Sequence, residues 1–215
     1  MSLRIVVGPM FAGKTSEVQS VVRRFGCLGK KVLVLTAEID NRYADVDTSG
    51  NTFVVNHDKN AVPARAVPID GLVAVTFWRE FEEATAIIVD EAQFFVDCLI
   101  PFVRLAVDQY GKHVVVVGLD SDASRRPFGD VLALAAHADS IEKKTALCKR
   151  CGDGTEAIFT RKLVVQDSGD SSAHSSVGSL GDSSAHSTLH PSGDPVEVGG
   201  SSLYEAVCRK HFNAI

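Results

Sequence analysis

An α/β fold built on a parallel sheet, followed by a smaller second lobe, is what this sequence predicts. Continuous runs of Val, Ile and Leu without alternation are typical of strands buried on both faces of a sheet. Four such runs occur, at Leu3 to Val7, Val32 to Leu35, Ala86 to Val89 and Val114 to Val117. Helical patterns separate several of them, and the amino-acid composition changes beyond residue 140. We therefore expect domains at 1–143 and 144–215.

The helical patterns follow the 3.6-residue period. After the first run, apolar residues recur at positions i, i+3, i+4 and i+7, namely Val18, Val21, Val22 and Phe25. Two further segments, Leu99 to Tyr110 and Val131 to Ala138, are also predicted as helices. Beyond residue 140, the stretch from Ala157 to Val165 is predicted as a strand of the smaller lobe.

Composition excludes several classes of protein. The chain has 215 residues, of which 45% are apolar, so it can bury a real core. A net charge of −5 argues against a protein whose main partner is nucleic acid, because phosphate neutralisation needs a basic face. No apolar run reaches the roughly 20 residues that cross a bilayer, and the apolar start is too short for a signal peptide. We expect a cytoplasmic protein.

A polar tract of Ser, Gly, Asp and His interrupts the smaller lobe at about residues 167–194. Within it GDSSAHS occurs twice, at 169–175 and 181–187. Its apolar groups are too few to offset the entropy of ordering it, so we expect a disordered loop. Its histidines, His174, His186 and His190, are expected to be solvated loop residues.

A glycine-rich segment lies between the first predicted strand and the first predicted helix. Its sequence GPMFAGKT fits the pattern G-x-x-x-x-G-K-[ST]. Glycines let backbone N–H groups close on phosphate oxygens, Lys14 supplies a charge to the β- and γ-phosphates, and the Thr15 hydroxyl can ligate Mg²⁺. The segment predicts a triphosphate site made of Gly8, Pro9, Met10, Phe11, Ala12, Gly13, Lys14 and Thr15.

Two carboxylates, Asp90 and Glu91, directly follow the third apolar run. Ligands of open α/β sheets bind beyond the carboxyl ends of strands, so these residues, the glycine loop and Gly118-Leu119-Asp120 are expected to share one crevice. Asp90 would hold the Mg²⁺ shell and Glu91 would act as a general base. In a kinase the base takes the proton of an acceptor hydroxyl, whereas in an ATPase it activates water. The pattern alone leaves both open.

Two pairs of metal-ligand residues lie in the second half of the chain. Cys148 and Cys151 are separated by two residues, and so are Cys208 and His211. Each spacing lets one tight turn present two donors, and two such turns complete a tetrahedron. Three cysteines and one histidine with no vacancy predict a structural zinc site. Cys27 and Cys98 have no partner of this kind and are expected to be ordinary buried thiols.

Five ordered stretches together resemble the type II thymidine kinases, the family of the human cytosolic enzyme. They are GPMFAGKT at 8–15, VDEAQFF at 89–95, GLDSDASRRPFG at 118–129, CKRC at 148–151 and VEVGGSSLYEAVCRKH at 196–211. The resemblance covers nearly the whole chain apart from the polar tract. It implies a RecA-like core, a small zinc lobe and a flexible lasso loop over the nucleoside. It also implies transfer of the ATP γ-phosphate to the 5′-hydroxyl of thymidine or deoxyuridine, giving dTMP for pyrimidine salvage and DNA synthesis.

Family roles fall on matching positions. Glu91 would be the base for the 5′-hydroxyl, while Asp90 and Gln93, with Asp40 and Arg42 of the DNRY stretch, would help to hold phosphates or sugar. The thymine ring of the nucleoside would lie between the aromatic side chains of Phe94, Phe128 and Tyr204. Further contacts to the nucleoside are expected from Met10, Leu119, Thr160, Val196, Glu197, Val198 and Gly199. A pocket that pairs with the base through backbone groups rejects cytosine.

Two departures from the family pattern are visible. Ala123-Ser124 stands where the family often has Phe-Gln, which predicts looser discrimination among thymidine analogues. The duplicated tract enlarges the lasso at small entropic cost, since closure entropy grows only logarithmically. The resemblance also implies a homotetramer inhibited by thymidine triphosphate. Alternatives are a P-loop ATPase acting on nucleic acid or protein, a kinase for another nucleoside such as deoxycytidine, and a non-enzymatic zinc-ribbon adaptor.

Overall fold

A seven-stranded sheet forms the larger part of the molecule. The computed structural model describes residues 1–39, 52–55, 61–163, 199–200 and 202–214. The strand order is β3-β4-β2-β5-β6-β1-β7, and every neighbouring pair is parallel except β3 with β4. The strands are β1 (Ser2–Val7), β2 (Val32–Ala37), β3 (Thr52–Val55), β4 (Ala61–Val67), β5 (Ala86–Val89), β6 (His113–Gly118) and β7 (Ser140–Lys143). The predicted α/β fold class is confirmed.

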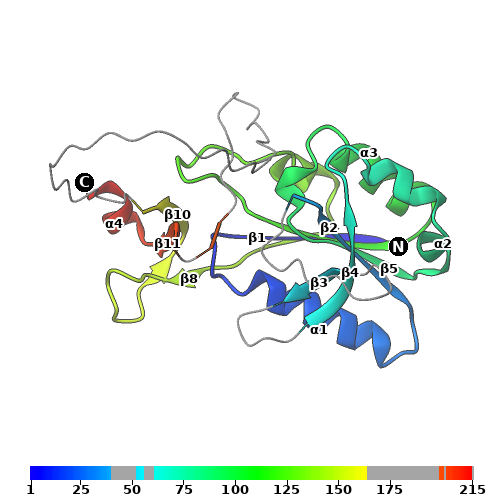
Figure 1. Cartoon of the computed structure of the whole chain (residues 1–215), viewed down its shortest axis with the longest axis horizontal. Coiled ribbons are helices and arrows are strands. Elements are labelled where there is room, and N and C mark those ends of the chain that lie inside the picture. Colours follow the sequence, from blue (N-terminus) through cyan, green and yellow to red (C-terminus); the bar gives the residue numbers. More distant parts are fainter. Residues whose placement is uncertain (40–51, 56–60, 164–198, 201, 215) are drawn as a thin grey trace, which may run out of the picture.

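Helices cover both faces of this sheet (Figure 1). On one face, α1 (Lys14–Gly26) buries Val18 and Val21 against residues of β1, β2, β5 and β6. On the other face pack α2 (Arg79–Glu83), α3 (Leu99–Arg104), the π-helical turn Leu105–Gln109, and the 3-10 helices Leu72–Phe77, Ala92–Phe94 and Leu132–His137. Because both faces are covered, the central strands are apolar on both sides, as their sequence predicted.

The smaller lobe lies at one end of the molecule (Figure 1). Its described residues form two two-stranded antiparallel sheets and one short helix: β8 (Ala146–Leu147) with β9 (Glu156–Ala157), β10 (Phe159–Lys162) with β11 (Tyr204–Val207), and α4 (Arg209–Asn213). The strand predicted at Ala157 to Val165 is thus divided at Ile158 between two ladders. The domain boundary at 143/144 stays a prediction. The expectation that Cys27 and Cys98 are buried thiols is wrong: Cys27 is exposed because it lies at the carboxyl end of α1, and Cys98 is only half-buried.

Some predictions fall outside the described residues. They concern Asp40 and Arg42, the backbone of Val196, Glu197 and Val198, and the polar tract at about 167–194 with its three histidines. Within the described residues, no helix is both long and apolar enough to span a membrane.

Candidate active site

The glycine loop leaves β1 and enters α1 through unusual backbone conformations. Gly8 has φ +151° and Gly13 has φ +72°. A Cβ on Gly8 would lie 2.4 Å from the carbonyl oxygen of Lys144, so only glycine fits there. Phe11 also adopts a positive φ of 65°, which is rare for an aromatic residue. Strained backbone of this kind clusters at ligand sites, where surrounding structure maintains it.

The ammonium of Lys14 lies inside this loop. Its Nζ donates to the carbonyl oxygen of Pro9 at 2.8 Å and to that of Gly8 at 3.2 Å. The side chain therefore folds back from the first turn of α1 over the loop that precedes it. In a G-x-x-x-x-G-K-[ST] loop this is the side of the loop on which the β- and γ-phosphates are held. Thr15 follows Lys14 in the same turn and is half-buried.

Asp90 and Glu91 take different directions where β5 ends. Asp90 continues the ladder, because its N–H donates to the carbonyl oxygen of Leu35, and the residue is 4% exposed. One Asp90 carboxylate oxygen accepts a hydrogen bond from the N–H of Glu91 at 3.0 Å. Glu91 then turns the chain with a left-handed φ of 49°. The half-buried Glu91 thus leaves the line of the strand, while Asp90 stays within it.

Gln93 joins the ends of β5 and β6. Its Nε2 donates to Oε2 of Glu91 at 2.6 Å, and its Oε1 accepts from the N–H of Leu119 at 3.0 Å. Sequence reasoning assigned Gln93 to phosphate binding and did not foresee the contact with Glu91. The contact with Glu91 joins residues only two positions apart but depends on the left-handed turn at Glu91. The contact with Leu119 had no local sequence signal, because Leu119 lies 26 residues away.

The glycine loop and Glu91 lie at the same edge of the sheet. β6 separates β1 from β5, and Val7 pairs with Gly118 while Val89 pairs with Val116. Parallel strands that are two positions apart are separated by about 10 Å. The structure therefore places the loop after β1, Leu119 after β6 and Glu91 after β5 along one side.

Asp120, which sequence reasoning placed in the same crevice without assigning it a role, also lies at this edge. Its Oδ2 pairs with Nζ of Lys143 at 2.6 Å. Its Oδ1 is the one buried side-chain polar atom that has no hydrogen-bond partner in the part of the chain that is described. Like Asp90, it follows a buried strand, and that position was the available sequence signal.

Two of the three predicted base-stacking aromatics meet. The rings of Phe94 and Phe128 lie edge-to-face with centroids 5.7 Å apart. Phe128 comes from the 118–129 loop, which is pressed against the 3-10 helix of Phe94. A Cβ on Gly129 would lie only 2.3 Å from the carbonyl oxygen of Gln93. Tyr204, the third aromatic, lies on β11 in the smaller lobe, opposite Lys162.

The smaller lobe contacts the glycine loop directly. The hydroxyl of Thr160 accepts a hydrogen bond from the N–H of Met10 at 2.9 Å, and Thr160 is 4% exposed. Phe11 and Ala12 pack against the apolar core of this lobe. Sequence reasoning placed Thr160 at the nucleoside base, whereas the structure gives its hydroxyl a partner in the glycine loop. Gly199 packs beside Leu203 before β11 begins.

Arg125 makes a second connection between the two parts of the molecule. Its guanidinium carbon lies 4.6 Å from the ring centroid of Phe212 and 5.5 Å from that of Phe159. Both rings belong to the smaller lobe, whereas Arg125 belongs to the 118–129 loop. Cation–π contacts of this kind contribute about 0.5–1 kcal/mol at exposed sites. No sequence pattern pointed to this contact.

The four predicted metal ligands come together. The donor atoms of Cys148, Cys151, Cys208 and His211 all lie within 4.8 Å of one another. Tetrahedral zinc with sulfur ligands at about 2.3 Å places neighbouring sulfurs about 3.8 Å apart. The sulfurs of Cys151 and Cys208 are 3.8 Å apart, and Nδ1 of His211 lies 3.3–3.5 Å from the three sulfurs. The donor set and its spacing suggest zinc.

The protonation of these thiols also fits a metal site. Burial raises the pKa of Cys148, but N–H groups of Cys208, Cys151 and Arg150, with the imidazole of His211, outweigh burial and lower that pKa to about 6. Burial and the neighbouring thiols raise the pKa of Cys151 to about 11. One thiol of the cluster therefore ionises readily beside another that keeps its proton, and a divalent cation would remove this conflict.

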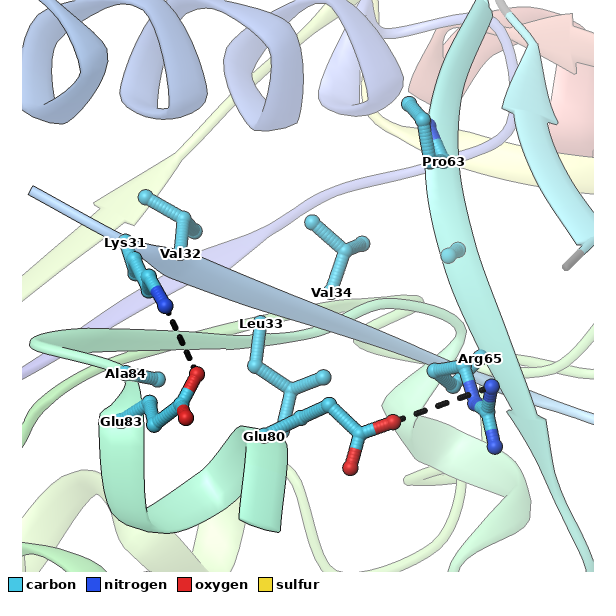
Figure 2. A pocket seen from close by; sticks show the side chains of 10 residues that line it. Lys31, Val32, Leu33, Val34, Pro63, Arg65, Glu80, Glu83 and Ala84 are labelled. Carbon is cyan, nitrogen blue, oxygen red and sulfur yellow. Dashed lines mark hydrogen bonds and ion pairs between the residues drawn. The ribbon is translucent and has the colours of Figure 1, made fainter.

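A surface hollow of ≈ 300 Å³ lies elsewhere, between β2 and β4 (Figure 2). Ladder pairing of these strands begins only at Leu35 with Arg65, so the first half of β2 is open on this side. Two ion pairs frame the hollow, Lys31 with Glu83 and Arg65 with Glu80. It lies at the amino-terminal half of β2, whereas ligands of parallel sheets bind beyond the carboxyl ends.

A G-x-x-x-x-G-K-[ST] loop after β1 and a carboxylate pair at the end of β5, two positions away in the sheet, are typical of P-loop enzymes of phosphoryl transfer. The model of the thymidine kinase family matches residues 1–212, and the chain belongs to this family of ATP-dependent kinases. The chain is 32% identical to a thymidine kinase of Oryza sativa subsp. japonica over 212 residues, which are 98% of this chain and 65% of the rice protein. This chain thus spans slightly less than two thirds of the rice relative.

A second relative, thymidine kinase 1 of Dictyostelium discoideum, is 36% identical over 213 residues, covering 99% of this chain and 78% of that protein. Among solved structures, the replication initiator DnaA bound to AMPPCP and single-stranded DNA matches 66% of this chain and 40% of its own. With a TM-score of 0.41 and 11% identity, that likeness bears on neither substrate nor partner.

Proposed function

We propose that this chain transfers the γ-phosphate of ATP to the 5′-hydroxyl of thymidine, and also of deoxyuridine, in pyrimidine salvage. The observation that carries the proposal is the position of Glu91. Its carboxylate is held by Gln93 at the same edge of the sheet as the glycine loop. An acceptor hydroxyl that lies between them can meet both a phosphate and a base.

The loop and the first turn of α1 bind the triphosphate. Backbone N–H groups of the loop surround the phosphate oxygens, except at Pro9, which has none, and at Met10, whose N–H donates to Thr160. The α1 dipole adds a positive potential at the same point. Lys14 exchanges its contacts with the Gly8 and Pro9 carbonyl oxygens for contacts with phosphate. Mg²⁺, when bound with ATP, neutralises charge on the β- and γ-phosphates. Thr15 and Asp90 are the residues that would hold it.

Glu91 orients and deprotonates the acceptor. Its carboxylate accepts the proton of the 5′-hydroxyl as the oxygen attacks the γ-phosphorus, and the bond from phosphorus to the β,γ-bridging oxygen breaks. A positioned general base of this kind contributes about 10²–10⁴-fold to a rate. Most of the remaining acceleration comes from alignment and from charge stabilisation, which the loop supplies.

The nucleoside base is selected next to Phe94 and Phe128. Their rings lie edge-to-face, and the short side chains of Ala123 and Ser124 leave more room than an aromatic residue would. Met10, Leu119, Thr160, Gly199 and Tyr204 complete the proposed nucleoside site, together with Val196, Glu197 and Val198. Asp40 and Arg42 are proposed to help with phosphate and sugar. Recognition of the base edge by backbone groups disfavours cytosine.

The cysteine and histidine quartet is proposed to bind structural zinc. All four donors come from the protein, so no position remains for substrate or water. The site therefore fixes the lobe that contacts Met10 and Phe11 and takes no direct part in the reaction.

ATP turnover with and without nucleoside tests the proposal. We expect ADP formation to require thymidine or deoxyuridine and to stay near background with deoxycytidine. Replacement of Lys14→Ala should abolish turnover, because the loop loses its cation. Turnover that is equally fast without any nucleoside would instead identify a P-loop ATPase, in which Glu91 activates water.

The family resemblance carries further proposals about assembly, control and location. We propose a homotetramer in the cytoplasm that thymidine triphosphate inhibits as an end product. Light scattering of the purified chain, and inhibition of thymidine phosphorylation by thymidine triphosphate at fixed ATP, test the first two.

A further inference from the structure

Gln93 is a buried polar residue whose side chain is committed at both ends. It is 1% exposed and is among the largest fully buried side chains of the described residues. Its Nε2 donates to Glu91 and its Oε1 accepts from the N–H of Leu119. Chemistry fixes this orientation of the amide, because an ionised carboxylate can only accept and a backbone N–H can only donate.

Two glycines allow the neighbouring backbone to pack closely against Gln93. A Cβ on Gly118 would lie 2.8 Å from Oε1 of Gln93, and a Cβ on Gly129 would lie 2.3 Å from its carbonyl oxygen. Both glycines bound the segment that runs from the end of β6 to Phe128. Gln93 is therefore enclosed by the segment that also supplies a ring of the nucleoside site, and this packing leaves its side chain little freedom.

Glu91 needs such support. Its φ of 49° is a backbone conformation that non-glycine residues keep only where the surrounding structure maintains it. The 2.6 Å contact from Gln93 comes from only two residues further along the chain and closes the turn. A hydrogen bond donated to a carboxylate also favours its charged form, which is the form that can accept a proton.

We infer that Gln93 is a positioning residue that aims the carboxylate of Glu91 and keeps it charged. It also links that carboxylate to the 118–129 loop. The position of Phe128 against the nucleoside and the position of the general base, Glu91, are therefore coupled. The inference rests on the proposed function, in which Glu91 is the general base. This positioning role is additional to the phosphate-binding role that the family resemblance implies for Gln93.

Two variants of Gln93 separate positioning from packing. Gln93→Leu keeps the volume and removes both hydrogen bonds. We expect kcat to fall on the order of a hundredfold, because a misplaced catalytic group costs about that much, while KM for thymidine changes less than about threefold. In the pH–rate profile of Gln93→Leu, the loss of rate at acidic pH should begin at a higher pH than in wild type, since the amide donor that favours the charged form of Glu91 is gone.

Gln93→Glu keeps the acceptor for Leu119 and places a second carboxyl group against Glu91. Two carboxyls in contact share one proton, and the singly protonated pair reproduces the donated hydrogen bond. We expect a rate within about tenfold of wild type in mildly acidic buffer. The rate should fall as the pH rises and the pair loses its shared proton, which adds an alkaline limb that wild type lacks.

Gln19→Glu is the matched control. Gln19 is the other glutamine that the described part of the chain buries, it lies on α1, and it is 7% exposed. The same added charge there should lower stability and leave the shape of the pH profile unchanged. If Gln93→Leu does not fold, the Gln93→Glu profile decides the question.

The inference is overturned if both Gln93 variants keep the wild-type pH profile and lose rate only in proportion to the folded fraction, measured by circular dichroism. The outcome is separable from that of the proposed function. If Glu91→Gln remains fully active, the proposed base is wrong. If Glu91→Gln is inactive but Gln93→Glu keeps the wild-type profile, only the positioning role fails.

Discussion

The sheet domain and the smaller lobe are stabilised in different ways. The sheet buries two clusters of apolar side chains, one on each face, including complete strands such as β5. In the described part of the lobe, six residues are buried in its own cluster, and two of them are the cysteines Cys148 and Cys208. Apolar burial of about 25 cal/mol per Å² can support the first region, whereas so small a cluster needs a cross-link. We therefore expect the lobe to depend on its ligand cluster and on its contact with the sheet domain.

That contact is also where the two regions affect each other. Phe11 and Ala12 of the glycine loop pack on the lobe, Thr160 accepts from Met10, and Arg125 lies over lobe aromatics. The triphosphate loop therefore has one end on the sheet and one side on the lobe. Unfolding of the lobe should therefore weaken ATP binding even while the sheet domain stays folded.

The largest expected effect comes from breaking the ligand cluster. Cys148→Ser should release the metal, unfold the lobe and lower ATP-dependent activity on the order of a hundredfold, because the loop loses its lateral support. Bound zinc can be counted by mass spectrometry, and limited proteolysis should cleave within 146–214 first. Far-UV circular dichroism should keep most of the sheet signal.

Ile88→Ala is the counterpart in the sheet. Ile88 is fully buried in β5, and such truncations cost about 2–5 kcal/mol. The zinc content of the folded fraction should not change. Release of zinc by Ile88→Ala, or global unfolding by Cys148→Ser, would contradict the separation of the two regions.

Phe11→Gly tests the contact between the regions more finely. Glycine suits the positive φ of this position, so the backbone strain is relieved, but the packing on the lobe is lost. We expect KM for ATP to rise on the order of tenfold while thermal stability changes little. Phe11→Leu, which keeps an apolar side chain, should stay closer to wild type. An unchanged KM for ATP in Phe11→Gly would show that packing of the loop on the lobe does not contribute to ATP binding.

A smaller effect is expected from the ion-pair network that links α1 to the sheet edge. Burial raises the pKa of Glu17, but hydrogen bonding to Arg4 and the charges of Arg4 and Lys144 outweigh it and lower that pKa. A depressed pKa stabilises the folded state above the ordinary value of 4.5 and loses that contribution as the pH falls through the folded-state pKa.

Glu17→Gln should therefore lower the free energy of unfolding at pH 7 by about 0.5–1 kcal/mol, and the difference from wild type should shrink as the pH falls below 4.5. Urea denaturation at several pH values measures this. A deficit that is constant with pH would assign the loss to packing instead of charge.

The smallest effect is expected from the polar tract. Deletion of residues 170–192 should leave kcat and stability largely intact, since shortening the closed loop about twofold changes the free energy of loop closure by only about 0.7 kcal/mol. A large loss of kcat in a folded deletion variant would assign the duplicated sequence a function.

Sequence patterns predicted the regions where the signal is local. The strands with continuous apolar runs, the glycine loop and the two ligand pairs are each contained in a few residues, and the structure has them as expected. β4 was missed because AVPARAV is broken by Pro63 and Arg65. β7 was missed because SIEK is a charged edge strand that pairs only with β1 in the described sheet.

Contacts between distant residues could not be read from the sequence. The hydrogen bond from Met10 to Thr160 joins residues 150 positions apart, and the contact of Gln93 with Leu119 depends on the adjacency of β5 and β6. The left-handed backbone of Phe11 and Glu91 is also a product of tertiary packing, because local preference opposes it.

Phosphate transfer from ATP to thymidine by Glu91→Gln tests the central claim most directly. The account predicts that dTMP formation falls about 10²–10⁴-fold while ATP still binds, since the amide keeps the shape of the side chain but cannot take a proton. A variant that forms dTMP at a rate close to wild type would contradict it.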